Sequence, residues 1–457
     1  MVIQPFLNFA RRSITIWRDH VRYAPWAATS VAAAGAARAW VTPAGPRRVA
    51  ILSGAYRLTG GGRFGRHLYG QIRPHLGEAV PWRDARVGWS RYDLTSPRPT
   101  LDRTIVLKAP SPTGERGVLL VMMEANWLKL LSRSREAAEL AEDYDLILST
   151  GWSPTDYRLL ALAVGTWPRP VFVQACNHGE IDRLDSFHPR LRCLPMIACD
   201  WINPDLYQPK PYAERTRDIV MVANWAPFKR HWHLFQALAR MPAGLRVTLI
   251  GQPEQGHTTD TVKALARVFG VKQDLEFLDR LTIEQVQRCQ EDARTSLILS
   301  RREGCCVAVC ESLFADSPVG LLRCAHVGPR AYVNTETGVL LEGGRLDRQL
   351  RAFLESAPTF RPREWAVRNV SCFTSMPRLN AFLREQAVRI GAHWTTDLAI
   401  CCWRPYPRYV HAADHEAMRP VYQRLHRLYP ELFRAELPAD VAPPAAPDEI
   451  QMPVRRG

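Results

Sequence analysis

Two glutamates eight positions apart, Glu303 and Glu311, are the residues of this chain best placed to do chemistry. The apolar run Leu297–Leu299 before them predicts a buried strand, Gly304 permits a sharp turn, and the apolar segment 306–314 predicts a helix. If the whole segment were helical, the two carboxylates would lie roughly 12 Å apart, at about 1.5 Å per residue. One could then contact the sugar and the other the ribose of a nucleotide sugar. Two isolated glutamates would more often be a surface turn residue and a helix residue paired with an arginine.

A second group of polar residues follows the strand predicted at 219–223. Lys229 stands at the start of a helix predicted at 230–241, where a diphosphate would meet both the ammonium group and the positive end of the helix dipole. Asn224 can donate a hydrogen bond to a phosphate but brings no charge. Strands and helices then alternate as far as the strand predicted at 297–300, which predicts a parallel α/β sheet.

The first half of the chain shows a weaker alternation of the same kind. Residues 48–53 predict an opening strand, and Gly60–Gly62 then lead into a helix that begins near Arg63. Glycine amides at a helix N-terminus attract anions, and Arg63 adds charge, although a purely structural turn would look the same. Further strands are predicted at 105–107, 118–122, 146–148, 171–174 and 194–198.

Two polar clusters in this half lead to different interpretations. Asn177 and His178 follow the carboxyl end of the strand 171–174, where ligands of open parallel sheets gather. Asp143 and Asp145 flank a tyrosine just before a strand begins, at the opposite edge, so they are interpreted as structural. The sequence therefore predicts no metal site.

Composition narrows the class of protein and its partners. The 457 residues exceed one ordinary core, and 46% hydrophobic with 23% charged residues describe a globular protein of two domains. A formal net charge of +15 favours anionic partners: a nucleotide diphosphate, an acidic glycan or a membrane surface. Nucleic acid is excluded as a partner because no aromatic-basic RNA motif or zinc-finger spacing is present. Eleven cysteines without a CxxC pair predict reduced thiols and a cytoplasmic location.

Residues 1–48 form a segment of their own. Aromatic and aliphatic residues alternate with arginines up to Trp26, and an alanine-rich stretch follows. The segment has neither the compact apolar core of a signal peptide nor the run of about 20 apolar residues without arginine that a spanning helix needs. A basic amphipathic helix that touches anionic lipid and a helix packed on the protein's own surface explain it equally well. Residues 42–46 predict a linker, and the proline-rich residues 437–457 predict a disordered tail.

The segment 300–313 resembles the E-x7-E motif of retaining GT-B glycosyltransferases, most closely the large family 4 group (group 1 type). Residues 317–322, 327–329 and 337–341 resemble segments that follow this motif in the family, and 205–209 resembles the segment before its interdomain hinge. The resemblance is strong over about residues 217–355. This chain departs from the family at three places: Cys305 and Cys306 replace Phe-Gly, Asp316 replaces a glycine, and Ala223 or Asn224 stands where the family has an arginine.

The resemblance implies a GT-B fold, in which two Rossmann-like domains with parallel sheets face each other across a cleft and a C-terminal helix returns to the first domain. The expected domains are an extension at 1–48, an acceptor domain at 49–210, a donor-binding domain at 211–360, a helical return at 361–436 and the tail at 437–457.

The same resemblance implies a retaining, metal-independent hexosyltransferase that needs no cofactor beyond its nucleotide-diphosphate sugar substrate. The acceptor would be a glycan, a lipid-linked glycan or another hydroxyl compound, met in the cytoplasm or at the inner membrane face. Two alternatives stay open: a non-catalytic scaffold of this fold at a membrane or cell-surface assembly, and a UDP-sugar epimerase. The residues expected in the site are Glu303 and His178 for catalysis; Lys229, Glu311, Asn224, Gly304, Cys305, Gly61 and Gly62 for the donor; and Arg63 and Asn177 for the acceptor.

Overall fold

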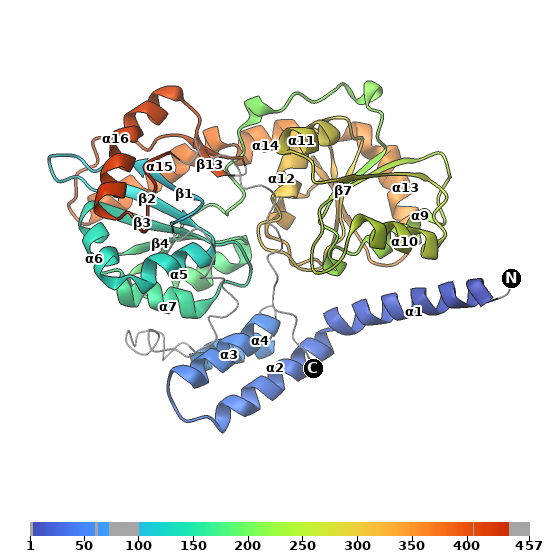
Figure 1. Ribbon diagram of the computed structural model, residues 1–457, viewed down its shortest axis with the longest axis horizontal. Coiled ribbons are helices and arrows are strands. Elements are labelled where there is room, and N and C mark those ends of the chain that lie inside the picture. The colour runs from blue at the N-terminus through green and yellow to red at the C-terminus, as the bar shows by residue number, and fades with distance from the viewer. Residues whose placement is uncertain (1–2, 60–62, 73–99, 405, 438–457) are drawn as a thin grey trace. The chain divides into compact units, whose positions relative to one another are not determined.

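The computed structural model describes residues 3–59, 63–72, 100–404 and 406–437, which divide into two compact units (Figure 1). The N-sheet unit takes the described residues of Pro25–Asn203 and Cys372–Pro443, and the C-sheet unit takes those of Met1–Ala24 and Pro204–Ser371. The first 24 residues are therefore grouped with the second sheet, and the chain leaves that unit after Ser371. The predicted loop at Gly60–Gly62 and the predicted tail beyond residue 437 lie outside the described residues.

The N-sheet unit is built on a five-stranded sheet with the order β1-β2-β3-β4-β5. The strands β2 to β5 run parallel, whereas β1 pairs antiparallel with β2. A short connection joins β1 to β2, and a short connection permits only antiparallel pairing. The strands are β1 (Thr104–Lys108), β2 (Gly117–Met122), β3 (Tyr144–Ser149), β4 (Val171–Gln174) and β5 (Leu191–Cys193).

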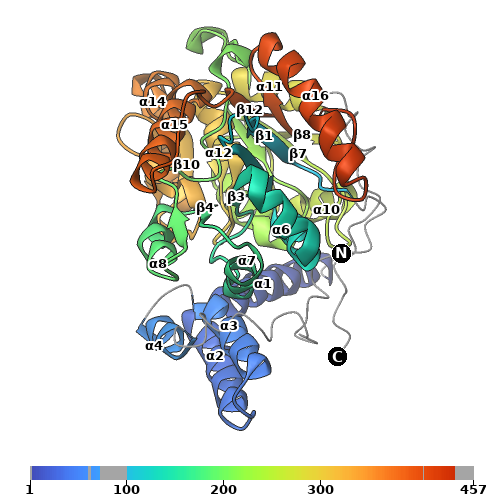
Figure 2. The same cartoon turned by 90° about the vertical axis from the view of Figure 1, so that its left-hand side faces the viewer.

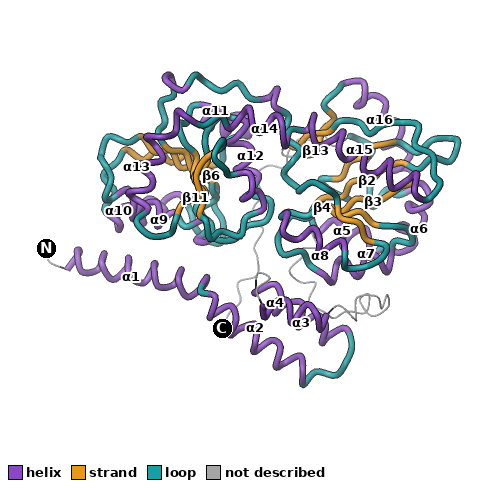
Figure 3. Tube along the Cα trace, turned by 180° about the vertical axis from the view of Figure 1, so that it is seen from behind, coloured by secondary structure: helices purple, strands orange, loops and turns teal. Residues whose placement is uncertain are grey.

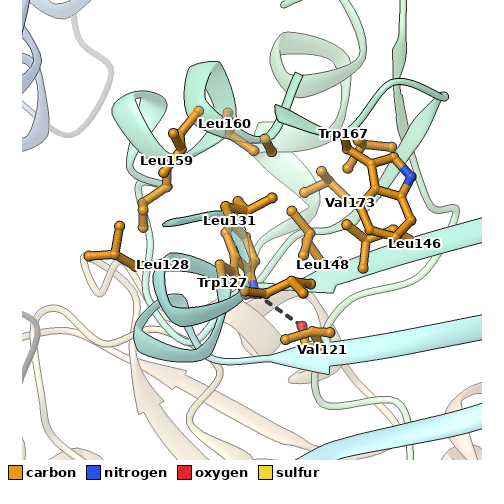
Figure 4. Packing of buried hydrophobic residues seen from close by; sticks show 14 of the residues in the cluster. Val121, Trp127, Leu128, Leu131, Leu146, Leu148, Leu159, Leu160, Trp167 and Val173 are labelled. Atoms are coloured by element: carbon orange, nitrogen blue, oxygen red, sulfur yellow. Dashed lines mark hydrogen bonds between the residues drawn. The ribbon is translucent and has the colours of Figure 1, made fainter. Parts of the chain in front are cut away.

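Both faces of this sheet are buried because successive side chains point to opposite sides. Leu119 and Val121 of β2 join one apolar cluster, and Val118 and Leu120 join another. Figure 4 shows the first cluster, in which Trp127 packs beside Leu148 and Val173 and donates its indole N–H to the Val121 carbonyl at 3.0 Å. The helices α5 (Glu124–Ser132), α6 (Ser134–Asp143) and α7 (Tyr157–Thr166) contribute to this cluster, and α15 (Cys372–Arg389) contributes to the other.

The strand predicted at 48–53 is wrong: these residues lie in helix α3 (Pro46–Thr59). Val49, Leu52 and Tyr56 are buried along one side of it, a helical spacing that a short apolar run does not distinguish from a strand. Helix α2 (Pro25–Trp40) packs on α3 through small residues, and a Cβ at Gly35 would lie 3.3 Å from Ala55 Cβ. Figure 2 shows α2, α3 and α4 (Arg63–Ile72) together, and the element before the predicted glycine turn is therefore a helix, where a strand was predicted.

The C-terminal segment completes the N-sheet unit. Helix α16 (Ala412–Leu428) lies within the predicted helical return at 361–436, and its Tyr422 hydroxyl accepts a hydrogen bond from the Val106 N–H at 3.1 Å. This is the predicted return of a C-terminal helix.

The strand predicted at 194–198 is wrong, because β5 ends at Cys193 and Pro195 has no N–H for a strand ladder. Two unpredicted short strands form a hairpin, β12 (Cys401–Arg404) and β13 (Tyr406–Tyr409); α8 (Ile181–Asp185) completes the helices of this unit.

The C-sheet unit contains a six-stranded, wholly parallel sheet of the order β8-β7-β6-β9-β10-β11 (Figure 3). Numbered from its first strand this is the order 3-2-1-4-5-6 of a doubly wound Rossmann sheet. The predicted α/β class with two Rossmann-like domains is thus confirmed. The strands are β6 (Ile219–Val222), β7 (Arg246–Gly251), β8 (Asp274–Asp279), β9 (Ser296–Ile298), β10 (Val319–Leu322) and β11 (Gly338–Leu341).

Helices connect these strands at close to the predicted positions. One helix of this unit, α1 (Ile3–Tyr23), does not connect two of its strands, because it comes from the N-terminus of the chain. No helix among the described residues is long and apolar enough to cross a membrane. The remaining helices of the unit are α9 (His231–Leu238), α10 (Thr259–Phe269), α11 (Ile283–Glu291), α12 (Val307–Phe314), α13 (Leu346–Ser356) and α14 (Pro362–Val370).

Candidate functional site

The strand order of the C-sheet unit fixes where a ligand would bind. The order reverses between β6 and β9, which are neighbours although the chain makes two further strands between them. Ligands of open parallel sheets bind outside the carboxyl ends of the strands at such a reversal. The segment that follows β6 carries Asn224 and Lys229, and the segment that follows β9 carries Glu303, Gly304 and Cys305. Five of the predicted site residues, four assigned to the donor and Glu303 to catalysis, therefore lie on segments that leave the sheet at its switch point.

Lys229 and Glu303 meet directly at this point. The Lys229 ammonium donates a hydrogen bond to Glu303 Oε2 at 2.7 Å, and the two side chains are 15% and 9% exposed. Burial, the largest single effect, lowers the pKa of Lys229, but the Glu303 carboxylate, through its charge and the hydrogen bond that it accepts, holds the pKa above its ordinary value. The lysine is therefore a full positive charge at neutral pH. Because the pair is not completely buried, an anionic ligand can replace Glu303 as the partner of this ammonium.

Backbone hydrogen bonds to the loop after β10 hold Glu303 in place. The Glu303 N–H donates to the His326 carbonyl at 2.9 Å, and the Gly328 N–H donates to the Gly304 carbonyl at 2.9 Å. Residues 327–329 were singled out from the sequence only as a resemblance. Here they form part of the frame that fixes the carboxylate.

The turn into α12 differs from the prediction. The sequence placed the turn at Gly304, but the residue with left-handed backbone is Cys306, with φ 42° and ψ 58°. A residue with a Cβ adopts this conformation at a cost of about 1–2 kcal/mol. Burial and the Glu303 carboxylate raise the pKa of the Cys306 thiol well above its ordinary value, and the thiol hydrogen-bonds that carboxylate. Cys306 thus contacts the site from a strained position, whereas only Cys305 was predicted to contribute.

The remaining donor-site candidates lie on the same two segments. Glu311 is half-buried in the second turn of α12. Because α12 begins at Val307, the separation estimated for a continuous helix does not apply to Glu303 and Glu311. Asn224 is half-buried in the loop after β6. This loop packs closely on β7, where a Cβ at Gly251 would lie 2.6 Å from the Ala223 carbonyl oxygen and 2.9 Å from the Trp225 ring.

The structure adds a second ion pair that sequence reasoning missed. Arg230 follows Lys229 in a left-handed conformation (φ 61°, ψ 40°), and its Nε donates to both oxygens of Asp19 in α1 at 3.1 Å. The two side chains are 2% and 6% exposed. Arg230 also donates to the Leu299 carbonyl at 3.3 Å, so it connects the segment of Lys229 to the segment of Glu303. Asp19 is the lone acidic residue among residues 1–48, and this was the signal that could have identified it.

Two buried residues close to Lys229 in the chain, His231 and Trp225, were also not singled out from the sequence. His231 is 3% exposed, and its ring lies 5.5 Å from that of Trp225, which is 1% exposed. Burial, with a smaller contribution from the Lys229 charge, lowers the pKa of His231 to about 3. His231 Nε2 and Trp225 Nε1 have no hydrogen-bond partner among the described residues. The imidazole is therefore neutral, and its remaining hydrogen bond, to the Ala223 backbone, ties α9 to the end of β6.

The predicted site residues of the first half belong to the N-sheet unit. Asn177 and His178 follow β4 as expected; the side-chain oxygen Oδ1 of Asn177 accepts a hydrogen bond from the Gly179 N–H at 2.8 Å. His178 has an exposed surface, and partial desolvation lowers the pKa of its imidazole. Arg63 is the exposed first residue of α4, and Gly61 and Gly62 lie outside the described residues. The participation of these residues in one site with Lys229 stays a prediction.

A buried carboxyl group beside Asn177 was not singled out from the sequence. Glu180 is 2% exposed, and Thr155 donates to it from its backbone N–H at 3.3 Å and its hydroxyl at 3.2 Å. Burial outweighs these hydrogen bonds and raises the pKa of Glu180 to about 7. Asp143 and Asp145 instead pair with Arg424 at 3.1 Å and Arg116 at 2.8 Å, ordinary structural contacts. All eleven cysteines lie in the described residues, and none forms a disulfide.

Comparison with known families bears on the C-sheet unit. Residues 205–361 match the family model described as "Glycosyl transferases group 1". The matched range contains the whole six-stranded sheet together with Lys229, Glu303 and Glu311. This match supports glycosyl transfer as the kind of reaction. The search of curated proteins gave no match.

Several solved structures resemble the chain at low identity. TarM is 13% identical over 58% of this chain and 54% of its own, with a TM-score of 0.45, so the match spans about half of that protein. Sucrose-phosphate synthase from Thermosynechococcus elongatus is 15% identical over 60% of this chain and 74% of its own, with a TM-score of 0.46. HepE from Anabaena in complex with UDP is 15% identical over 58% and 78%, also with a TM-score of 0.46. At these values the likenesses identify neither a donor nor an acceptor.

Proposed function

We propose that the chain is a retaining glycosyltransferase that takes a sugar from a nucleotide-diphosphate donor without a metal ion. The observation that carries the proposal is the contact of Lys229 with Glu303 at 2.7 Å, at the point where the strand order reverses. A charged lysine and a carboxylate at this point offer one group for a diphosphate and one for sugar hydroxyls. The family match over residues 205–361 supports the same reaction.

In the proposed reaction the donor replaces the Lys229–Glu303 contact. The diphosphate takes the ammonium of Lys229, which releases the Glu303 carboxylate to accept hydrogen bonds from the sugar. Glu311 then accepts from the ribose hydroxyls, while Asn224 and the backbone of Gly304 and Cys305 line the donor. Exchange of one anionic partner for another keeps Lys229 paired, so the donor does not leave a charge buried alone.

The bond changes balance without an enzymic nucleophile. The bond between the sugar anomeric carbon and the phosphate oxygen breaks, and the acceptor oxygen forms its bond on the same face. The departing phosphate oxygen receives the acceptor proton. Lys229 stabilises the charge that develops on the diphosphate, and the Glu303 carboxylate stabilises the positive character of the sugar ring.

The acceptor side of the proposal rests on the N-sheet unit. Arg63 and Asn177 would bind a glycan or lipid-linked acceptor. Gly61 and Gly62 would contact the donor, and His178 would contact the reacting sugar. A cytoplasmic enzyme at the inner membrane face fits the net charge of +15.

The first test is nucleotide binding to Lys229→Ala. Loss of a charge-assisted hydrogen bond of about 1.5–3 kcal/mol weakens UDP or GDP binding roughly 10- to 150-fold. Calorimetric titration and thermal shift in EDTA measure this, because a bound ligand at about 100 times its Kd adds about 2.7 kcal/mol of stability. Lys272→Ala, at an exposed lysine of the same unit, is the matched control.

A double variant separates lost attraction from new repulsion. In Lys229→Ala the Glu303 carboxylate faces the diphosphate alone, so Lys229→Ala/Glu303→Gln recovers part of the affinity if both residues contact the ligand. Equal affinity of the parent and Lys229→Ala for every nucleotide diphosphate removes Lys229 from the site. Binding without turnover of any nucleotide sugar in EDTA supports the non-catalytic scaffold instead.

A further inference from the structure

Helix α1 presents its apolar side to solvent and its polar side to the C-sheet unit. At 3.6 residues per turn, Phe6, Leu7, Ile14 and Trp17 lie within roughly 100° of the helix circumference. They are 70%, 40%, 48% and 65% exposed. A helix that packs on a domain normally buries such a stripe. In α1 the opposite face does the packing.

Polar contacts hold the packed face of α1. Asp19 forms the buried ion pair with Arg230, and the Arg12 guanidinium donates to the Val268 carbonyl at the end of α10. The Arg12 guanidinium also lies 5.8 Å from the centre of the Phe269 ring. These contacts fix which side of the helix faces outward.

The exposed side combines apolar and basic residues. Arg11, Arg18 and Arg22 are exposed along one edge of the apolar stripe. The helix has one acidic residue, Asp19, and that residue is buried on the other face. The outer surface of α1 is therefore apolar and aromatic in the middle, basic along one edge and free of acidic groups.

We propose that this face of α1 docks on an anionic lipid surface, with the helix axis in the plane of the membrane. Large aromatic side chains suit the boundary between headgroups and acyl chains, and arginines at that depth pair with lipid phosphates. The 21 residues of α1 would be long enough to span a bilayer, but the helix is too polar and carries too many arginines to do so. An interface between two copies of α1 would place their basic edges close together, and the helix has no exposed acidic residue to pair with them.

This inference is independent of the chemistry proposed for the C-sheet unit. It depends on the orientation of α1, which Asp19 and Arg12 determine, and not on any bound nucleotide. The two proposals can therefore fail separately: vesicle binding and nucleotide binding are measured on the same protein in different assays.

The test is flotation of the full chain with vesicles of phosphatidylcholine alone or with about one third phosphatidylglycerol. We expect binding to the anionic vesicles that falls as salt is raised. Phe6→Ser/Trp17→Ser should lower the partition coefficient at least tenfold, because both side chains would enter the interface. Arg11→Glu/Arg18→Glu should lower it at least 20-fold on anionic vesicles, at about fivefold for each arginine lost.

Val388→Ser/Ile390→Ser is the matched apolar control, because these residues are 64% and 62% exposed elsewhere in the chain. Arg288→Glu, at an exposed arginine of α11, is the matched charge control. Both should bind vesicles like the parent, and all variants should keep the nucleotide affinity of the parent. No binding of the parent to anionic vesicles overturns the proposal. A concentration-dependent dimer that the α1 variants abolish overturns it in favour of a second copy.

Discussion

Removal of the Asp19 carboxylate should destabilise the C-sheet unit although the residue lies near the start of the chain. Asp19→Ala leaves the Arg230 guanidinium buried, 2% exposed, and without its carboxylate. At 3.1 Å and an effective dielectric constant near 20, the attraction between the two charges is about 5 kcal/mol before desolvation is counted. Measured losses on removing one partner of a buried pair are about 3–5 kcal/mol. We expect a loss in this range.

Hydrogen exchange followed on peptides from residues 205–361 as a function of urea measures the stability of the unit that contains the pair. For a domain of 150–250 residues each kcal/mol lowers Tm by about 2–4 °C, so the unit should melt on the order of 10 °C lower. Arg18→Ala, at an exposed arginine of the same helix, should stay within about 0.5 kcal/mol of the parent.

A double-mutant cycle with Arg230→Met isolates the pair from other effects. Asp19→Leu/Arg230→Met replaces both charges by apolar groups and should recover most of the loss, because neither charge is then buried alone. A loss below about 1 kcal/mol in Asp19→Ala, or additive effects in the cycle, would refute the view that this pair holds α1 on the unit.

Two further predictions concern the site and the response to pH. Glu311→Gln should raise the donor KM about tenfold with a smaller change in kcat, and Glu303→Gln should lower kcat about 100-fold with less change in binding; steady-state kinetics on both variants would show exchanged roles as the opposite pattern. Burial lowers the pKa of His231 and of His233 to about 3, so below pH 6.5 the unfolded C-sheet unit binds more protons than the folded unit. The free energy of unfolding of this unit should therefore fall as pH falls from 6.5 toward 3, by up to about 1.4 kcal/mol per pH unit for each histidine. Burial raises the pKa of Glu180 to about 7, so the folded N-sheet unit binds the extra proton and loses stability as pH rises from 4.5 to about 7. Unit-resolved hydrogen exchange should show these opposite slopes; His233→Gln should reduce the slope of the C-sheet unit, and Glu180→Gln should reduce that of the N-sheet unit. A slope of the opposite sign in either unit would contradict the assignment for that unit.

The sequence predicted the C-sheet unit well because its signals are local. Strands of three to six residues alternate with helices between turn residues, and this pattern alone implies a parallel sheet. Once the sheet order places β6 beside β9, Lys229 and Glu303 must leave it side by side, 74 positions apart in the chain. Their contact follows from topology, which the resemblance supplied and local pattern did not.

The parts that failed depend on long-range packing. The apolar run at 48–53 satisfies a strand or a helix, and only its packing against the small residues of α2 decides for the helix. Asp19 and Arg230 are 211 positions apart, and nothing in either local sequence indicates that the two side chains form a buried ion pair. The left-handed turn at Cys306 was assigned to Gly304 because glycine is the usual residue for it.

The two ion pairs at the switch point differ in a way that assigns them different tasks. Lys229 and Arg230 are consecutive, and the left-handed backbone of Arg230 sends its side chain to Asp19 while Lys229 reaches Glu303. The Lys229 pair is 15% and 9% exposed and joins the two segments that would bind the donor, so a ligand can replace Glu303 as the partner of the ammonium. The Arg230 pair is 2% and 6% exposed, and an anion that reached it would still have to displace Asp19 from a buried bidentate contact. In the proposed reaction, Lys229 would therefore exchange Glu303 for the donor, while Arg230 and the N-terminal helix would hold the surrounding segments in place.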